Sequence, residues 1–228
     1  MWATTEVLLM KAWMETRWRL LGACAYPALF LFLDRQNPTV HGMVTGMGTV
    51  LTICAMMFAG TGVRSQAPAL FREGVAGSTQ FTISLPVSRR RLLTIRAAAG
   101  LMEAAILTLI TALATWALVP VIRSAVAPAD FARLVLIVLL FMSVPYSAVV
   151  FFNTLVDDPI SGIYAGYSTT LVLWLLHKAG PAVDIIRVGG QNSPLVTHGL
   201  PWPQMATMVC LTLILFWAAI RSVETREY

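Results

Sequence analysis

Residues 134–152 read LVLIVLLFMSVPYSAVVFF, a stretch without a single charged side chain. A helix needs about 20 such residues to cross the roughly 30 Å hydrocarbon core of a bilayer. Further apolar stretches occupy residues 20–33, 43–62, 97–119, 160–176 and 204–220. Each is predicted to be a transmembrane helix, because a spanning segment in lipid must satisfy its own backbone hydrogen bonds. The predicted fold is therefore all-α, with six transmembrane helices forming a single domain over residues 1–228.

The composition supports a membrane protein. Hydrophobic residues make up 57% of the chain and charged residues 12%, whereas soluble domains have about 45–50% and about 25%. The net charge is +5, but no soluble fold is left to carry a basic face, so nucleic acid is excluded as a partner. Cys24, Cys54 and Cys210 all fall inside apolar spans. We interpret them as small buried hydrophobic residues.

Residues 4–19 have the pattern of an amphipathic helix. One face carries apolar residues at spacings of three and four, namely Val7, Met10, Met14 and Trp18. A second face carries the charged residues Lys11, Glu15 and Arg19. We expect a helix that lies in the membrane interface before the first span. The alternative is a ragged cytoplasmic start to that span.

The distribution of lysine and arginine predicts the orientation. Of the 16 such residues, eleven fall on the side that holds both termini and the loop 63–96, and five fall on the other side. Because cytoplasmic loops carry an excess of Lys and Arg, we expect both termini and loop 63–96 to face the cytoplasm. An even number of spans agrees with this orientation.

The chain has no pattern typical of an enzyme. A phosphate loop needs a lysine after glycine, but Lys11 follows Met10 and Lys178 follows His177. We therefore expect no ATP hydrolysis by this chain. No pair among His41, His177 and His198 has the spacing of one helical turn, so we expect interfacial histidines and no metal site. A hydrolase reading would require Ser168 and His177, which lack the nucleophile-elbow pattern.

Two features inside the spans are candidate sites. Glu103 is the only carboxylate well inside a predicted span, and burial of a lone charge in lipid is costly. It is predicted either to make a structural hydrogen bond or to belong to a substrate path. Gly162 and Gly166 form a small-residue pair that lets helices approach closely. They are candidates for contact with a second subunit, with tight packing inside the chain as the alternative.

The loop 63–96 has an unusual mixture of apolar and basic residues. Ser88 can cap the helix that follows. Arg89, Arg90 and Arg91 can bind anionic lipid headgroups and anchor the start of the next span at the membrane surface. Anchoring alone is one reading, whereas the length and mixed polarity of the loop favour a docking surface as well.

The same loop resembles a family, the membrane-spanning permease subunits of type-two ABC exporters. The matching pattern is an aromatic residue and a glutamate, a spaced glycine, an apolar-threonine stretch and a Leu-Pro-Val-Ser-Arg run. In this chain it consists of Phe71 and Glu73, Gly77, Phe81-Thr82-Ile83-Ser84, and Leu85-Pro86-Val87-Ser88-Arg89. The general layout of the chain is also similar to that family, but the specific motif covers only residues 71–96.

The resemblance implies a function and partners. In that family the first cytoplasmic loop rests on a separate ABC ATPase subunit, which binds ATP and Mg, and two permease subunits pair around the substrate path. We therefore expect a multi-pass permease in a bacterial inner membrane, with no cofactor of its own and with a second permease that is identical or different. The predicted ATPase-coupling residues are Phe71, Arg72, Glu73, Gly77, Phe81, Leu85 and Pro86. The alternative is a membrane scaffold or sensor subunit that transports nothing. The substrate stays open.

Overall fold

A computed structural model describes residues 89–155, 161–189 and 193–225, and each element in these ranges is a helix. The long helices are α4 (Arg89–Leu118), α6 (Pro128–Leu155), α7 (Ser161–Ala179) and α9 (Trp202–Thr225). The short elements are α5 (Pro120–Ala125), the 3-10 helix η2 (Ile185–Gly189) and α8 (Pro194–Thr197). The all-α prediction is confirmed for these ranges, in which no strand occurs.

Three helices of the described part are long and apolar enough to cross a membrane. They are Leu93–Leu118 within α4, Pro128–Leu155 and Trp202–Thr225. The predicted spans 97–119, 134–152 and 204–220 are thus confirmed as helices of spanning character. Each helix is longer than its apolar stretch, because helical hydrogen bonding continues into the polar residues that flank the stretch.

α7 covers the predicted span 160–176, but it is not among the three helices that qualify by length and composition. Its first ten residues, SGIYAGYSTT, include two glycines, two serines and two threonines, which dilute its apolar character. At about 1.5 Å per residue α7 is about 28 Å long, close to the thickness of a hydrocarbon core. Six spans therefore stay a prediction, and spans 20–33 and 43–62, helix 4–19 and loop residues 63–88 lie outside the described residues.

Proline and glycine set the ends of the helices. α4 ends at Leu118, Val119 is extended, and Pro120 opens α5, because proline lacks the N–H that a continuing helix needs. The predicted end of the span before Pro120 is confirmed. α7 ends before Gly180, whose φ of 131° is a conformation that side chains with a Cβ rarely adopt.

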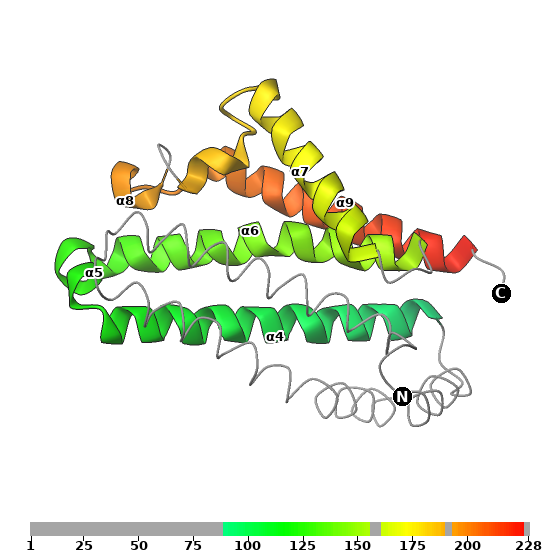
Figure 1. Cartoon of the computed structure of the whole chain (residues 1–228), viewed down its shortest axis with the longest axis horizontal. Coiled ribbons are helices and arrows are strands. Elements are labelled where there is room, and N and C mark those ends of the chain that lie inside the picture. The colour runs from blue at the N-terminus through cyan, green and yellow to red at the C-terminus, as the bar shows by residue number, and fades with distance from the viewer. Residues whose placement is uncertain (1–88, 156–160, 190–192, 226–228) are drawn as a thin grey trace.

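The helices pack around α6 (Figure 1). α4 runs antiparallel to α6 and lies beside it, and α9 runs in the same direction as α6. α7 crosses α6 and α9 obliquely, so that its C-terminal end stands away from the other long helices (Figure 1). η2 and α8 lead back from the end of α7 to the start of α9.

The bundle has two ends, the Arg90 end and the Asp130 end. At the Arg90 end, α4 begins and α9 finishes, joined by an ion pair between Arg90 and Glu224. At the Asp130 end, α6 begins next to α8, and Arg133 donates a hydrogen bond to the carbonyl of His198. In the predicted orientation the Arg90 end faces the cytoplasm.

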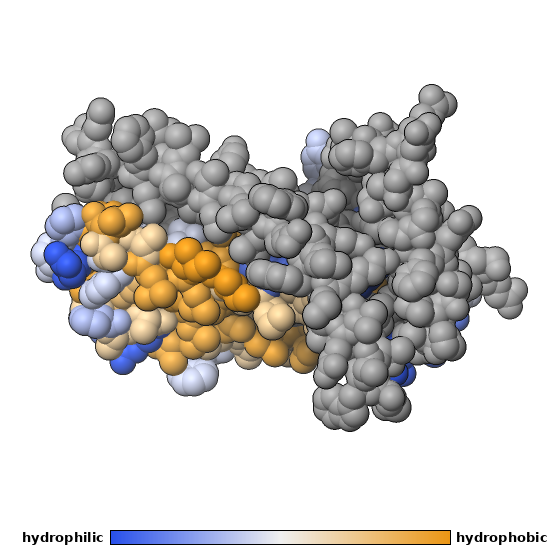
Figure 2. Space-filling model, turned by 90° about the horizontal axis from the view of Figure 1, so that it is seen from below, coloured by the Kyte–Doolittle hydropathy of each residue, from blue (hydrophilic) through white to orange (hydrophobic). Residues whose placement is uncertain are grey.

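The core divides into three apolar clusters. The largest lies between α4, α6 and α9 and surrounds Tyr146, which is fully buried. A second lies between α6, α9 and η2, with α7 packed against it through Leu173 and Leu176. The third closes the α4–α5–α6 turn, where the rings of Trp116 and Phe131 are 4.8 Å apart. Elsewhere α4 presents an apolar side, seen in Figure 2 as the orange surface, with exposed residues Met102, Ile106, Leu109, Ile110, Leu113 and Leu118.

Candidate functional site

The described part of the predicted coupling loop is the start of α4. The helix begins at Arg89 and continues through Arg90 and Arg91 without interruption. Arg90 lies 3.5 Å from Glu224, and Arg221 lies 3.8 Å from the same carboxylate. Both arginines are well exposed, so these ion pairs contribute little stability. The arrangement leaves the arginine side chains at the surface, where the sequence predicts contact with lipid headgroups.

The other predicted coupling residues lie outside the described residues, namely Phe71, Arg72, Glu73, Gly77, Phe81, Leu85 and Pro86. Pro86 nevertheless precedes Arg89 by only three residues. The predicted coupling segment is therefore connected by a few residues to α4, a helix of 30 residues.

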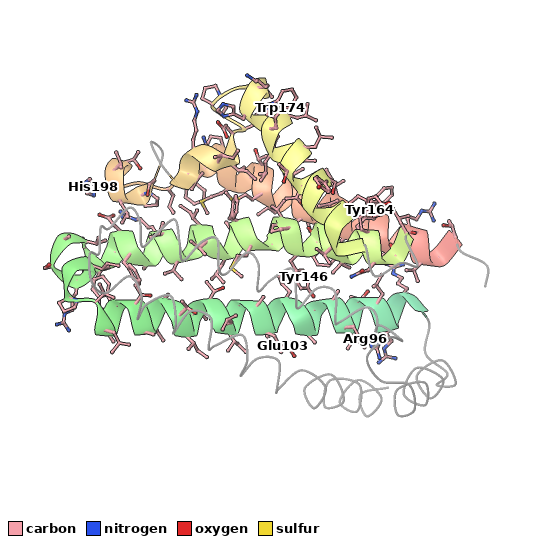
Figure 3. All side chains as sticks on the ribbon, in the orientation of Figure 1. Arg96, Glu103, Tyr146, Tyr164, Trp174 and His198 are labelled. Carbon is pink, nitrogen blue, oxygen red and sulfur yellow. The ribbon has the colours of Figure 1, made fainter. Side chains whose placement is uncertain are left out.

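Glu103 lies in the first half of α4, and only 4% of its surface is exposed. Figure 3 shows Glu103 and Arg96 along α4, and Tyr146 between α4 and α6. Burial of a carboxylate in an apolar helix is costly, so Glu103 stays a candidate site residue on α4.

Tyr146 makes the closest contact between α4 and α6. Its hydroxyl donates a hydrogen bond of 2.7 Å to the carbonyl of Ala97. A Cβ placed on Gly100 would lie 2.5 Å from the same hydroxyl. Real Cβ atoms do not come this close to another atom, so a side chain at position 100 would force the Tyr146 hydroxyl to move.

Buried hydroxyls follow one side of α4. Thr108, Thr111 and Thr115 each donate to the carbonyl four residues earlier. Thr108 also lies 3.0 Å from the sulfur of Met142 on α6. These bonds satisfy the hydroxyls within the chain, so the threonines do not by themselves require a ligand. The sequence analysis did not single them out, although their spacing of three and four residues marks one helix face.

Pro145 interrupts the hydrogen-bond pattern of α6. Ser143 donates to the carbonyl of Leu140, and Ser147 donates to the carbonyl of Val144. The hydroxyl of Ser143 also lies 2.8 Å from that of Thr212 on α9. Serine side chains thus supply hydrogen bonds on both sides of the proline.

α7 carries the predicted subunit-contact glycines. The space beside Gly166 is open, since no atom lies within 4 Å of a Cβ built there, and Gly162 belongs to the same helix. Exposed residues occur along α7 at spacings of three and four, namely Tyr164, Tyr167, Leu171 and Trp174. Figure 3 shows Tyr164 and Trp174 toward the two ends of this helix. α7 therefore offers an aromatic, apolar face that no described part of the chain covers.

A polar junction joins α6 to α8 at the Asp130 end. Asp130 is buried in the first turn of α6. It accepts hydrogen bonds from Arg133 at 2.7 Å and from His198 Nδ1 at 2.6 Å. The backbone of His198 is left-handed, with φ of 52°, and its carbonyl accepts from Arg133. The end of α8 is thus joined to the start of α6 by Asp130, Arg133 and His198.

A second polar junction joins α7 to η2. Asp184 is fully buried, and its carboxylate accepts hydrogen bonds from His177, Arg187 and the backbone N–H of Ile186. Burial acts to raise the pKa of Asp184, but the hydrogen bonds from His177, Ile186 and Arg187 together lower that pKa below its ordinary value of 3.8. The side chain of Gln204 donates to the carbonyl of Pro181 at 2.8 Å, which ties the same loop to α9.

The two described histidines therefore have structural partners. His177 and His198 each contact one buried aspartate, and within the described ranges no group of three His, Cys, Asp or Glu side chains could hold a metal ion. The sequence analysis treated these histidines as interfacial and did not foresee either aspartate. Ser168 and His177 are nine residues apart on one continuous helix, or about 13.5 Å of helix rise, too far for a direct hydrogen bond.

Comparison with known proteins gives no assignment. No protein-family model matches the chain, and no curated protein sequence or solved structure matches it either.

Proposed function

We propose that this chain is the permease subunit of an ATP-binding-cassette exporter, driven by separate ATPase subunits. One observation carries the proposal. The Leu85-Pro86-Val87-Ser88-Arg89 run, on which the resemblance depends, leads directly into α4, a helix of 30 residues with an apolar spanning portion. A partner that pushed on residues 71–88 would act at the end of a rigid element that reaches the other end of the bundle.

Buried polar groups support transport over scaffolding. The case for a non-transporting scaffold or sensor rests on apolar spans with few polar groups inside. The helices of spanning character bury a carboxylate, hydroxyls and an amide at Glu103, Thr108, Thr111, Thr115, Ser143, Ser147, Asn153 and Thr154. The hydroxyls bond within the chain, but an ionisable side chain such as Glu103 inside a membrane helix commonly marks a substrate or ion pathway. A hydrolase is disfavoured because α7 separates Ser168 from His177 along its axis.

The partner ATPase can be tested by co-purification. The full-length tagged chain is solubilised in detergent from the cells that naturally produce it, and bound proteins are identified by mass spectrometry. An ATPase with a phosphate loop is expected. Glu73→Ala and Phe81→Ala should lower its yield, because charge and buried apolar anchors direct docking. Arg123→Ala, at the Asp130 end, is the matched control and should leave the yield unchanged. Transport by the pure chain without any ATPase would contradict the proposal.

The same proposal includes a second permease subunit, identical or different, that packs on α7. The open space at Gly166 and the exposed aromatic residues along α7 support this surface. A cysteine at Gly166, in a background without Cys24, Cys54 and Cys210, should form a disulfide-linked dimer in native membranes. A cysteine at Leu109 on α4 is the control. If neither position cross-links to another permease, the face of α7 contacts lipid alone.

A further inference from the structure

α6 contains a built-in weak point at its centre. Pro145 has no N–H to donate to the carbonyl one turn earlier, so one helical hydrogen bond is missing at this point. The hydroxyls of Ser143 and Ser147 bond to carbonyls three residues before them. Such side-chain bonds help to tolerate a proline in a membrane helix and favour bending there. The segment 140–147 is therefore the part of α6 best suited to change its angle.

Two contacts hold this segment on opposite sides. Towards α4, the Tyr146 hydroxyl donates to the carbonyl of Ala97 and fits against Gly100. Towards α9, the hydroxyls of Ser143 and Thr212 lie 2.8 Å apart. Tyr146 follows the proline and belongs to the half of α6 nearer the Arg90 end, whereas Ser143 precedes it. These two hydroxyl contacts therefore join α6 to α4 after the break and to α9 before it, whereas the contacts of Met142 and Phe131 with α4 before the break involve a thioether sulfur and an aromatic ring.

The half of α6 that precedes the proline has its own attachments. Asp130 and Arg133 join it to His198 beside α8. Ile137 and Val144 pack in the cluster that includes Ile185 of η2 and Met208 of α9. This half of α6 is therefore connected to the α7–α9 connection, not to α4 alone.

We propose that Pro145 is a hinge in α6 and that Tyr146 is a positioning residue that fixes one half of α6 to α4. α4 and residues 146–155 then move as one body, while residues 128–141 change angle together with α8 and η2 by sliding on their apolar contacts with α4, which are non-directional. The inference rests on the proposed function in one respect. Residues 71–88 precede α4, so a displacement produced by an ATPase there would pass through Gly100 and Tyr146 to the Asp130 end.

Distances between spin labels test the hinge in the full-length chain, free of native cysteines and reconstituted in lipid nanodiscs. An inner pair joins Met102 on α4 to Leu155 at the end of α6. An outer pair joins Leu113 on α4 to Leu136 on α6, and all four positions are exposed. We expect a narrow distance distribution for the inner pair and a broader one for the outer pair.

Two variants test the hinge at Pro145 and the positioning role of Tyr146 separately. Tyr146→Phe keeps the ring but removes the hydroxyl, and it should broaden the inner distribution to the width of the outer one. Pro145→Ala restores the missing donor and should narrow the outer distribution. Thr207→Val removes a hydroxyl from a site of α9 that takes part in neither contact and should alter neither pair.

Equal widths for the two pairs in the parent chain would overturn the hinge. An unchanged inner pair in Tyr146→Phe would overturn the positioning role, whether or not an ATPase co-purifies. If the distances behave as expected but no ATPase is recovered, the hinge stands and the proposed function fails. The two proposals therefore fail by different measurements.

Discussion

Gly100 on α4 and Gly166 on α7 are the same residue in opposite surroundings. Gly100 lies under the hydroxyl of Tyr146, where a methyl group would be 2.5 Å away, whereas Gly166 faces open space. Spacing in the sequence pointed to Gly166 as a contact residue and did not point to Gly100. A glycine in a membrane helix allows another helix to approach closely. Whether a helix of the same chain does so depends on the residues that lie opposite the glycine.

The largest effect is expected from Gly100→Ala. The new methyl group must displace a hydroxyl held by a 2.7 Å hydrogen bond. Overpacking of this kind costs about 1–3 kcal/mol. The free energy of unfolding in mixed micelles, followed by tryptophan fluorescence, should fall accordingly. Tyr146→Phe should partly rescue the variant, since the next ring atom is 3.4 Å from the added Cβ. A double variant no more stable than Gly100→Ala alone would show that the clash lies elsewhere.

A slightly smaller loss of stability is expected from Asp184→Ala. Because α7 has no close packing at Gly166, this substitution tests whether the Asp184 junction holds α7 in place. The substitution removes the acceptor for His177, Arg187 and the N–H of Ile186. Hydrogen bonds to a charged group contribute about 1.5–3 kcal/mol, and the exposed His177 and Arg187 can regain water. We therefore expect a loss of about 1.5 kcal/mol in the same unfolding measurement. Asp184→Asn, which keeps an acceptor, should lose less.

The attachment of α7 should also weaken in acid. The folded-state pKa of Asp184 lies below its ordinary value of 3.8. The stabilisation from this carboxylate is thus present above about pH 4 and is lost as pH falls through the folded value. Thermal midpoints between pH 3 and 7 should drop at the acid end in the parent chain, and the drop should be smaller in Asp184→Asn. An equal drop in both would assign the acid sensitivity to other carboxylates.

The smallest effect is expected from Gly166→Ala. A methyl group there meets no atom within 4 Å, and alanine is the better helix former by about 1 kcal/mol. The isolated monomer in detergent should be unchanged or slightly more stable. A clear loss of stability in the monomer would show that an atom of the same chain occupies this space.

The long apolar helices follow from the sequence because their signal is local. Residues 97–119, 134–152 and 204–220 are uninterrupted apolar runs, and Pro120 marks a boundary by its own chemistry. Contacts between distant residues carry no such signal. His198 lies 68 positions after Asp130, and Tyr146 lies 49 positions after Ala97. Only the packing of whole helices brings these pairs together, which is why the Asp130 junction and the Gly100 contact were not foreseen. The partners of Asp184 lie within seven residues of it, but they follow no regular helical spacing that would have marked the junction.

The diluted apolar character of α7 has a consequence for biogenesis. α6 and α9 are long and apolar enough to cross a membrane, whereas α7 begins with SGIYAGYSTT and is not among the helices that reach the same mean hydropathy. Its apolar partners include Ile185 and Met208, which are synthesised after it. We therefore expect α7 to stay beside the insertion machinery until α9 emerges, so that the last helix of the chain decides when the preceding one is released into lipid.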